Sequence, residues 1–182
     1  MRFKEIREFY NQTKFLGEVT QYKALQLFME TPEYQKIEDD VEKSLNTPGK
    51  LKELAKNKDW KVRLALAESL KIKPDMPEEL VKEAKKVAEG LLHDRGWAVR
   101  VALAQNSNIE PNFFKELAEE LANDKDWRVK IFGLGFNDNI PEEISKRVVK
   151  ENEGLLVRLA KLFGTQEDVE ELMSLLREDK KI

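Results

Sequence analysis

Four cationic side chains recur at one position of a repeated segment, and cations in a row could bind an acidic ligand. They are Arg63, Arg100, Lys130 and Arg158. One interpretation is a basic stripe that binds an acidic protein or a phosphate backbone. We favour the other, in which each cation pairs with a carboxylate of its own or the preceding segment, because an unpaired buried charge is costly. Asp94 and Asp124 are the candidate carboxylates, and Asp94 is the first candidate for Arg100.

All three tryptophans of the chain precede one of these cations by three residues. They are Trp60, Trp97 and Trp127. An exposed row of aromatic side chains could stack nucleic-acid bases or anchor a protein partner. We expect instead that the tryptophans are mostly buried between units, Trp97 above all. Trp97 opens the segment 97–104, which is apolar almost all round, and such a helix packs between neighbours.

Other site chemistry has little support in the sequence. The chain has no cysteine, which excludes disulfides, thiolate metal sites and cysteine nucleophiles. The single histidine, His93, fits a polar turn residue, and no nucleophile-elbow motif accompanies it. The pair Gly133 and Gly135 lacks the preceding strand and the third glycine of a phosphate-binding loop. We therefore expect no cofactor, no metal site and no enzymatic activity.

The repeated segments have a spacing that is typical of helical repeats. Successive valines of the motif are 37, 30 and 28 residues apart, and they are Val62, Val99, Val129 and Val157. Four prolines with similar spacing interleave with them, namely Pro48, Pro77, Pro111 and Pro141. Proline favours the first position of a helix, and Thr47 could cap the first of these helices. Each unit is thus predicted to contain a solvated helix, an Asn/Asp turn and a buried helix.

Stacking of these units predicts an all-α fold. One helix pair cannot bury both of its faces, so the units must pack on one another. We expect a right-handed α-solenoid of stacked helix pairs in one continuous domain. Residues 1–47 would form an N-terminal helical cap, residues 48–164 the repeats, and residues 165–182 a C-terminal capping helix.

The third unit departs from the pattern by one residue. Seven positions separate Val99 from Asn106, whereas eight separate Val129 from Asn137. We expect the extra residue to form a helix bulge. Glycine replaces alanine in this segment, and we expect it to permit close packing rather than to make a hinge.

The sequence resembles two families of helical repeats. The segment 99–106, then Pro111, Leu117-Ala118 and the segment 124–127 resemble the leucine-rich repeat variant and are similar to HEAT-like repeats over about residues 48–164. The resemblance implies a scaffold or adaptor that binds a protein or peptide. Some variant-repeat proteins also carry an iron–sulfur segment, but this chain has no cysteine to ligate one. The similarity to HEAT-like DNA glycosylases implies the alternative, nucleic-acid binding through basic and aromatic side chains.

Composition bears on these function classes. The chain has 182 residues and a net charge of −3, which argues against nucleic acid, since affinity there comes largely from clustered positive charge. No apolar run is long enough to span a membrane, and residues 1–5 do not resemble a signal peptide. We therefore expect a cytoplasmic protein without membrane contact. Abundant lysine and glutamate without cysteine suggests a hot-environment source.

Overall fold

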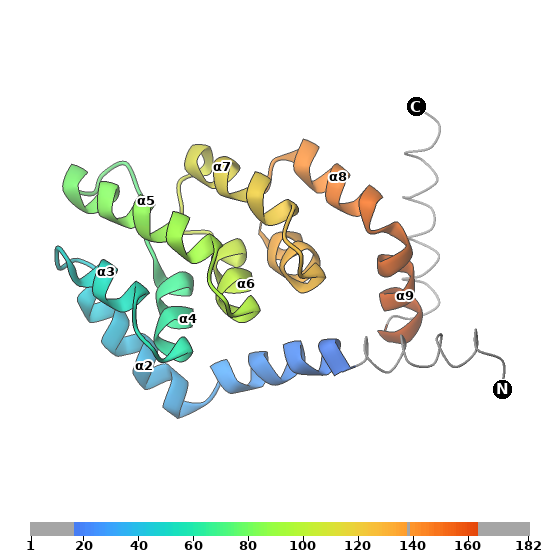
Figure 1. Cartoon of the computed structure of the whole chain (residues 1–182), viewed down its shortest axis with the longest axis horizontal. Coiled ribbons are helices and arrows are strands. Elements are labelled where there is room, and N and C mark those ends of the chain that lie inside the picture. Colours follow the sequence, from blue (N-terminus) through green and yellow to red (C-terminus); the bar gives the residue numbers. More distant parts are fainter. Residues whose placement is uncertain (1–16, 138, 164–182) are drawn as a thin grey trace.

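The protein is built from helices, as a computed structural model shows for residues 17–137 and 139–163 (Figure 1). A first helix covers residues 17–29, and the others are α2 (Pro32–Ser44), α3 (Lys50–Ala55), α4 (Trp60–Ser69), α5 (Glu78–Leu92), α6 (Trp97–Gln105), α7 (Pro111–Ala122), α8 (Glu142–Glu151) and α9 (Glu153–Phe163). No strand occurs in the described ranges, where one isolated bridge joins Ile72 to Ile109. The all-α prediction is confirmed there, while residues 1–16 of the predicted N-terminal cap and the capping helix predicted over residues 165–182 lie outside the described residues.

Prolines mark the helix starts nearly as the sequence predicts. Pro111 is the first residue of α7, and Pro77 and Pro141 directly precede α5 and α8. The start of α3 differs, because its N-cap is Gly49, with a φ of 83° that favours glycine, instead of Thr47.

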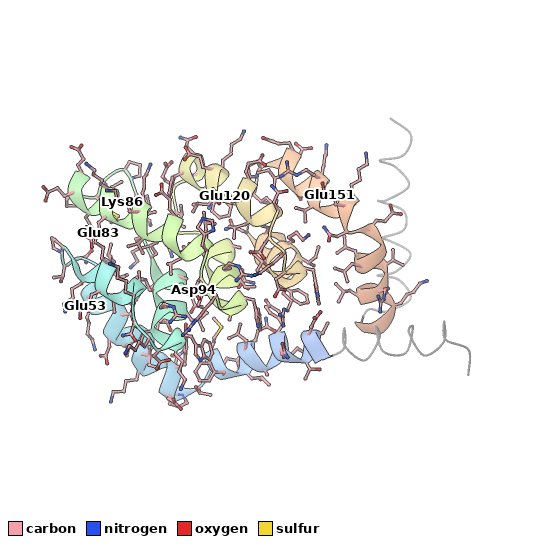
Figure 2. The ribbon with its side chains drawn as sticks, viewed as in Figure 1. Glu53, Glu83, Lys86, Asp94, Glu120 and Glu151 are labelled. Carbon is pink, nitrogen blue, oxygen red and sulfur yellow. The ribbon has the colours of Figure 1, made fainter. Side chains whose placement is uncertain are left out.

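A carboxylate from the following unit caps α3. The Glu83 side chain, on the side of α5 that faces α3 (Figure 2), accepts hydrogen bonds from the backbone N–H groups of Gly49 at 2.9 Å and Lys52 at 3.2 Å. These groups are among the first N–H donors of the helix, which have no partner within it. The cap therefore also links two successive units.

The helices form two rows, with helix 17–29 lying across the inner one (Figure 1). The outer row contains α5, α7 and α8, and each packs on the next. The inner row contains α4, α6 and a π-helix, η1 (Val129–Gly133), which also pack on one another in order. The core lies between the rows, where Leu66, Leu103 and Phe114 are fully buried.

The extra residue of the third unit forms the expected bulge. A 3-10 turn, η2 (Leu134–Phe136), follows η1 directly, so the third inner segment is wider and then tighter than α6. Gly133 faces α6 so closely that an added Cβ would lie 2.7 Å from the Ala104 Cβ, whereas nothing lies within 4 Å of such an atom on Gly135. Close packing is thus confirmed for Gly133 only.

Buried asparagines tie the end of each inner segment to the unit before it. The Asn106 side-chain amide donates to the carbonyls of Ala67 at 2.8 Å and Leu70 at 2.9 Å. The Asn137 amide donates to the carbonyls of Ala104 at 2.7 Å and Asn106 at 3.3 Å. Because buried carbonyls need a donor, these amides satisfy groups that the preceding helix end leaves unpaired.

Candidate binding groove

The first member of the cationic column, Arg63, is buried in an ion pair with the next unit. Its Nε donates to Oδ2 of Asp94 at 2.6 Å and its Nη2 donates to Oδ1 at 3.2 Å. The two side chains are only 7% and 8% exposed. Nη1 donates to the backbone carbonyl of Asn57 at 2.7 Å. Such a two-point pair is well suited to arginine, and it confirms charge pairing between units at this position.

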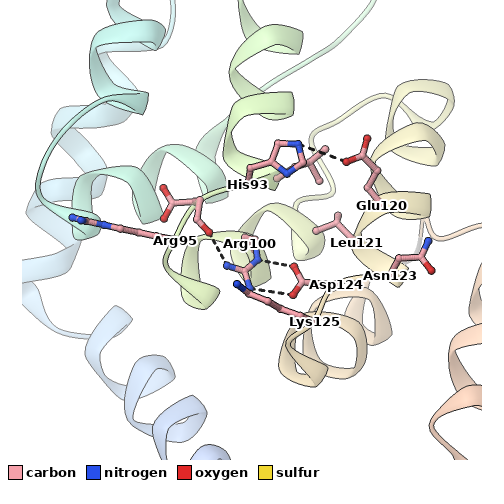
Figure 3. A pocket seen from close by; sticks show the side chains of 10 residues that line it. His93, Arg95, Arg100, Glu120, Leu121, Asn123, Asp124 and Lys125 are labelled. Carbon is pink, nitrogen blue, oxygen red and sulfur yellow. Dashed lines mark hydrogen bonds and ion pairs between the residues drawn. The ribbon is translucent and has the colours of Figure 1, made fainter.

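Arg100 repeats this arrangement one unit later, but with a different partner from the one the sequence suggested. Its Nε and Nη2 donate to the carboxylate of Asp124 at 2.6 and 3.0 Å, and Nη1 donates to the backbone carbonyl of Asp94 at 2.6 Å (Figure 3). The expectation that the Asp94 carboxylate would hold Arg100 is therefore wrong. Each arginine lies in the first turn of an inner helix and reaches forward to the next inter-helix turn, so Asp94 instead serves Arg63.

Contacts with arginine shape the electrostatics of Asp94. Burial, the largest single influence, raises the pKa of this carboxyl. Hydrogen bonds from Arg63 and from the backbone N–H of Gly96, with the charges of Arg63 and Arg95, outweigh burial, and the pKa of Asp94 is lowered. The ionised carboxylate is therefore the form that the fold stabilises.

The other two members of the column lie in different surroundings. Lys130 is half-buried, and the residue that corresponds to Asp94 and Asp124 in the following turn is the neutral Asn152. Arg158 is exposed on α9. The four cations that the sequence aligned therefore do not form one continuous exposed stripe.

The three tryptophans lie on the inner row with unequal exposure. Trp97 and Trp127 are half-buried, so the expectation of a largely buried Trp97 is only partly met. The Arg128 guanidinium lies 4.0 Å from the centre of the Trp97 ring, and the Trp127 indole donates to Glu18 at 2.6 Å. Trp60 is 40% exposed, and its ring centre lies 5.7 Å from that of Phe28.

Helix 17–29 covers part of the inner row through contacts with successive units. Tyr22 stacks on Phe132 with ring centres 4.1 Å apart, and its hydroxyl accepts a hydrogen bond from Gln105 at 3.0 Å. Gln21 accepts a hydrogen bond from Arg128 at 2.6 Å. Our sequence reasoning missed this docking. The available signal was the spacing of Val19, Tyr22 and Leu25, three residues apart and all buried here.

An open groove remains between this helix and the inner row. It has a volume of about 400 Å³ and is mostly apolar, and we call it the Trp60–Trp97 groove. Helix 17–29 contributes Gln21, Ala24, Leu25 and Phe28, and the inner row contributes Trp60, Gly96, Trp97 and Ala98. The structure thus brings two of the three tryptophans to one cavity, while Trp127 is not among its lining residues.

Three exposed cations stand in the inter-helix turns, each two residues before a tryptophan. These turn cations are Lys58, Arg95 and Lys125. None of them forms a salt bridge with another residue in the part of the chain that the structure describes. Sequence reasoning missed this row, although its constant distance from the tryptophans was a usable signal. The sequence pattern assigned the periodic positive charge instead to Arg63, Arg100, Lys130 and Arg158, of which the first two are buried and the third is half-buried.

A second cavity separates two of these turns (Figure 3). Its volume is about 520 Å³, and it is lined by polar side chains that include Arg95, Arg100, Asp124 and Lys125. His93 stands at its edge, 3.8 Å from Glu120, and is largely exposed, as a polar turn residue would be. The Arg100 guanidinium in this cavity is already bonded to the Asp124 carboxylate and the Asp94 carbonyl, which leaves Arg95 and Lys125 as the cations there without a salt bridge to a described residue.

Residues 17–137 and 139–163 contain neither a candidate metal site nor a candidate membrane span. No three His, Asp or Glu side chains in these ranges are grouped to hold a metal ion. None of the helices described there combines the length and apolarity needed to cross a bilayer.

Comparison with known proteins returns no relative. No protein-family model matches the chain, and neither a curated protein nor a solved structure is significantly similar to it. A functional proposal therefore depends on the geometry of the groove.

Proposed function

We propose that the chain is a non-enzymatic, cytoplasmic scaffold of the right-handed α-solenoid type, which binds a peptide segment of a partner protein on its inner row. The order of packing supports the solenoid, since α4, α6 and η1 pack in sequence, as do α5, α7 and α8. The Arg–Asp pairs and the buried asparagines, both of which join adjacent units, support it further. A leucine-rich variant or HEAT-like origin remains part of this proposal.

One observation carries the binding role. The inner row already holds a helix, residues 17–29, by side-chain contacts from three successive segments: Trp60 of α4, Gln105 of α6 and Phe132 of η1. Beside that helix the Trp60–Trp97 groove leaves apolar surface open. Apolar clefts with aromatic walls are the usual anchoring sites for peptide side chains.

The alternative, nucleic-acid binding, has weaker support. It depends on Arg63, Arg100 and Lys130 acting together beside the tryptophans. Arg63 and Arg100 are buried against Asp94 and Asp124, so neither can reach a phosphate without breaking its ion pair. The net charge of −3 adds nothing in its favour.

A random peptide library displayed on phage, selected against the immobilised full chain, tests the proposal. We expect enriched peptides whose affinity falls at least tenfold for Trp60→Ala, because the exposed ring forms one wall of the groove. Leu27→Ala is the matched control, since Leu27 is 66% exposed and does not line the groove. Absence of enrichment, or tight salt-dependent binding of duplex DNA instead, contradicts the proposal.

A further inference from the structure

The Trp60–Trp97 groove offers a partner both apolar surface and a hydrogen-bond donor. Trp60 is one of two large apolar side chains that stand well exposed in the described residues. Its indole N–H makes no hydrogen bond to any described residue, whereas the Trp127 indole is bonded to Glu18. Arg128 covers one face of Trp97, but the groove still includes that ring. An occupant must therefore bring apolar or aromatic side chains.

The inter-helix turns that lead into the inner-row walls of the groove carry excess positive charge, although the chain is acidic overall. The carboxylates of its inter-helix turns are largely neutralised, because Asp94, Asp124 and Asp126 form salt bridges with Arg63, Arg100 and Arg128.

What is left uncompensated in these turns is cationic. Besides the turn cations Lys58, Arg95 and Lys125, these described turns contain only one acid without a salt bridge, Asp59, which caps α4 by accepting from the N–H of Lys61. Arg95 and Lys58 are also close in sequence to groove walls, since Gly96 and Trp60 both line it. A partner with carboxylates at its edges would match this charge.

The turn cations repeat with the spacing of the units. They precede α4, α6 and η1, which pack directly on one another, and packed helices have axes about 8–10 Å apart. An occupant that crosses the units would meet a cation at roughly that interval. Three cations are few for nucleic acid, whose binding usually uses more phosphate contacts.

We propose that the Trp60–Trp97 groove binds an acidic peptide segment, in which aromatic or aliphatic side chains enter the groove while Asp and Glu side chains pair with the turn cations. The inference rests on the proposed function and specifies the chemistry of the partner. Affinity comes mainly from the apolar anchors, and the carboxylates set the choice of partner and its orientation.

Charge reversal of the turn cations tests this inference. The phage-displayed random peptide library is selected in parallel against the wild-type chain and the triple variant Lys58→Glu/Arg95→Glu/Lys125→Glu. We expect wild-type selections rich in Asp and Glu beside aromatic or Leu residues, and selections from the variant rich in Lys and Arg beside the same apolar residues. A wild-type peptide, followed by fluorescence anisotropy, should bind the variant at least tenfold more weakly.

The matched control carries the same change in net charge elsewhere. Lys82, Lys86 and Lys150 are exposed on α5 and α8, and their triple replacement by Glu leaves the turns intact. The control should select acidic peptides as wild type does. Thermal melts of both variants by circular dichroism verify that they are folded.

The outcomes separate the two proposals. The acidic-partner inference is overturned if the selected peptides depend on Trp60 but are neutral or basic. It is also overturned if the wild-type chain and the charge-reversed triple variant select peptides of the same charge. Either result leaves the scaffold proposal standing. No enrichment from the wild-type chain overturns both. Displacement of an acidic peptide by a short single-stranded oligonucleotide at physiological salt overturns the inference in favour of nucleic acid.

Discussion

The second and third inner segments pack on the preceding unit through similar end contacts but have different helix types. α6 and the segment 129–136 both come after an inter-helix turn, with Trp97 as the first residue of α6 and Trp127 two residues before η1. Both end at a buried asparagine that donates to the preceding unit. α6 is regular, whereas the third segment is a π-helix followed by a 3-10 turn. The contacts at both ends are kept, and the extra residue is absorbed between them. Unit boundaries are thus more constrained than helix interiors in this chain.

A second difference lies in the charge pairs that leave these segments. Arg100 binds Asp124 in a buried two-point pair, while the equivalent Lys130 is only half-buried, and the position equivalent to Asp124 in the next turn is the neutral Asn152. Buried arginine pairs therefore join the first unit to the second and the second to the third, whereas the ion pairs that link α7 to α8, Arg147–Glu119 and Lys115–Glu143, are more exposed. The predictions below act on these differences.

The largest expected effect is loss of a buried arginine. Arg100→Ala leaves the Asp124 carboxylate buried without its cation, and we expect a loss of about 3–5 kcal/mol in the free energy of unfolding. Lys130→Ala, the equivalent change one unit later, should stay within about 0.5 kcal/mol. Urea denaturation followed by circular dichroism measures both. Equal losses would show that the two positions are coupled alike.

The next effect concerns the close approach of η1 to α6. Gly133→Ala places a Cβ 2.7 Å from that of Ala104, so one of the segments must shift, and we expect a loss of about 1–3 kcal/mol. Gly135→Ala is the control, because the space around its Cβ is open. The same urea titrations apply. If Gly133→Ala is as stable as Gly135→Ala, the π-helix yields easily and does not constrain the interface.

Acid should weaken the first ion pair in a defined direction. Since the folded state lowers the pKa of Asp94, its ionised form contributes stability above the ordinary pKa of about 4, and this contribution is lost as the pH falls through the lowered value. Unfolding free energies between pH 7 and pH 2 should therefore fall less steeply for Asp94→Asn than for wild type. Asp75→Asn, on an exposed residue, serves as the control. A slope unchanged by Asp94→Asn would contradict the role of this pair.

The smallest effect would come from building the missing pair. Lys130→Arg with Asn152→Asp recreates in the third unit the residue types of the Arg100–Asp124 pair. Because Lys130 and Asn152 are half-buried, we expect a favourable coupling of about 0.5–1 kcal/mol in a double-mutant cycle. A coupling near zero would mean that the bulge moves the two positions out of register.

Sequence alone predicted features that depend on local pattern. Prolines located the helix starts within a residue or two, and the residue count from Val129 to Asn137 located the π-helix. The Arg–Asp pairing was predicted with the wrong direction, because periodicity does not say whether a side chain reaches forward or backward along the stack. Helix 17–29 on the inner row was missed for a similar reason. Its apolar spacing predicts a buried face but does not identify what buries it.

The two sets of inter-unit contacts give the second unit complementary edges. Toward the unit before it, this unit presents Asp94 for an arginine and Asn106 for free carbonyls. Toward the unit after it, it presents Arg100 and the carbonyl of Ala104, which need the same two partners. A tandem duplication of about residues 77–110 would therefore join to itself without a new interface. Duplication of this segment could therefore lengthen the protein one unit at a time. Each added copy would extend the inner row by one tryptophan and one turn cation.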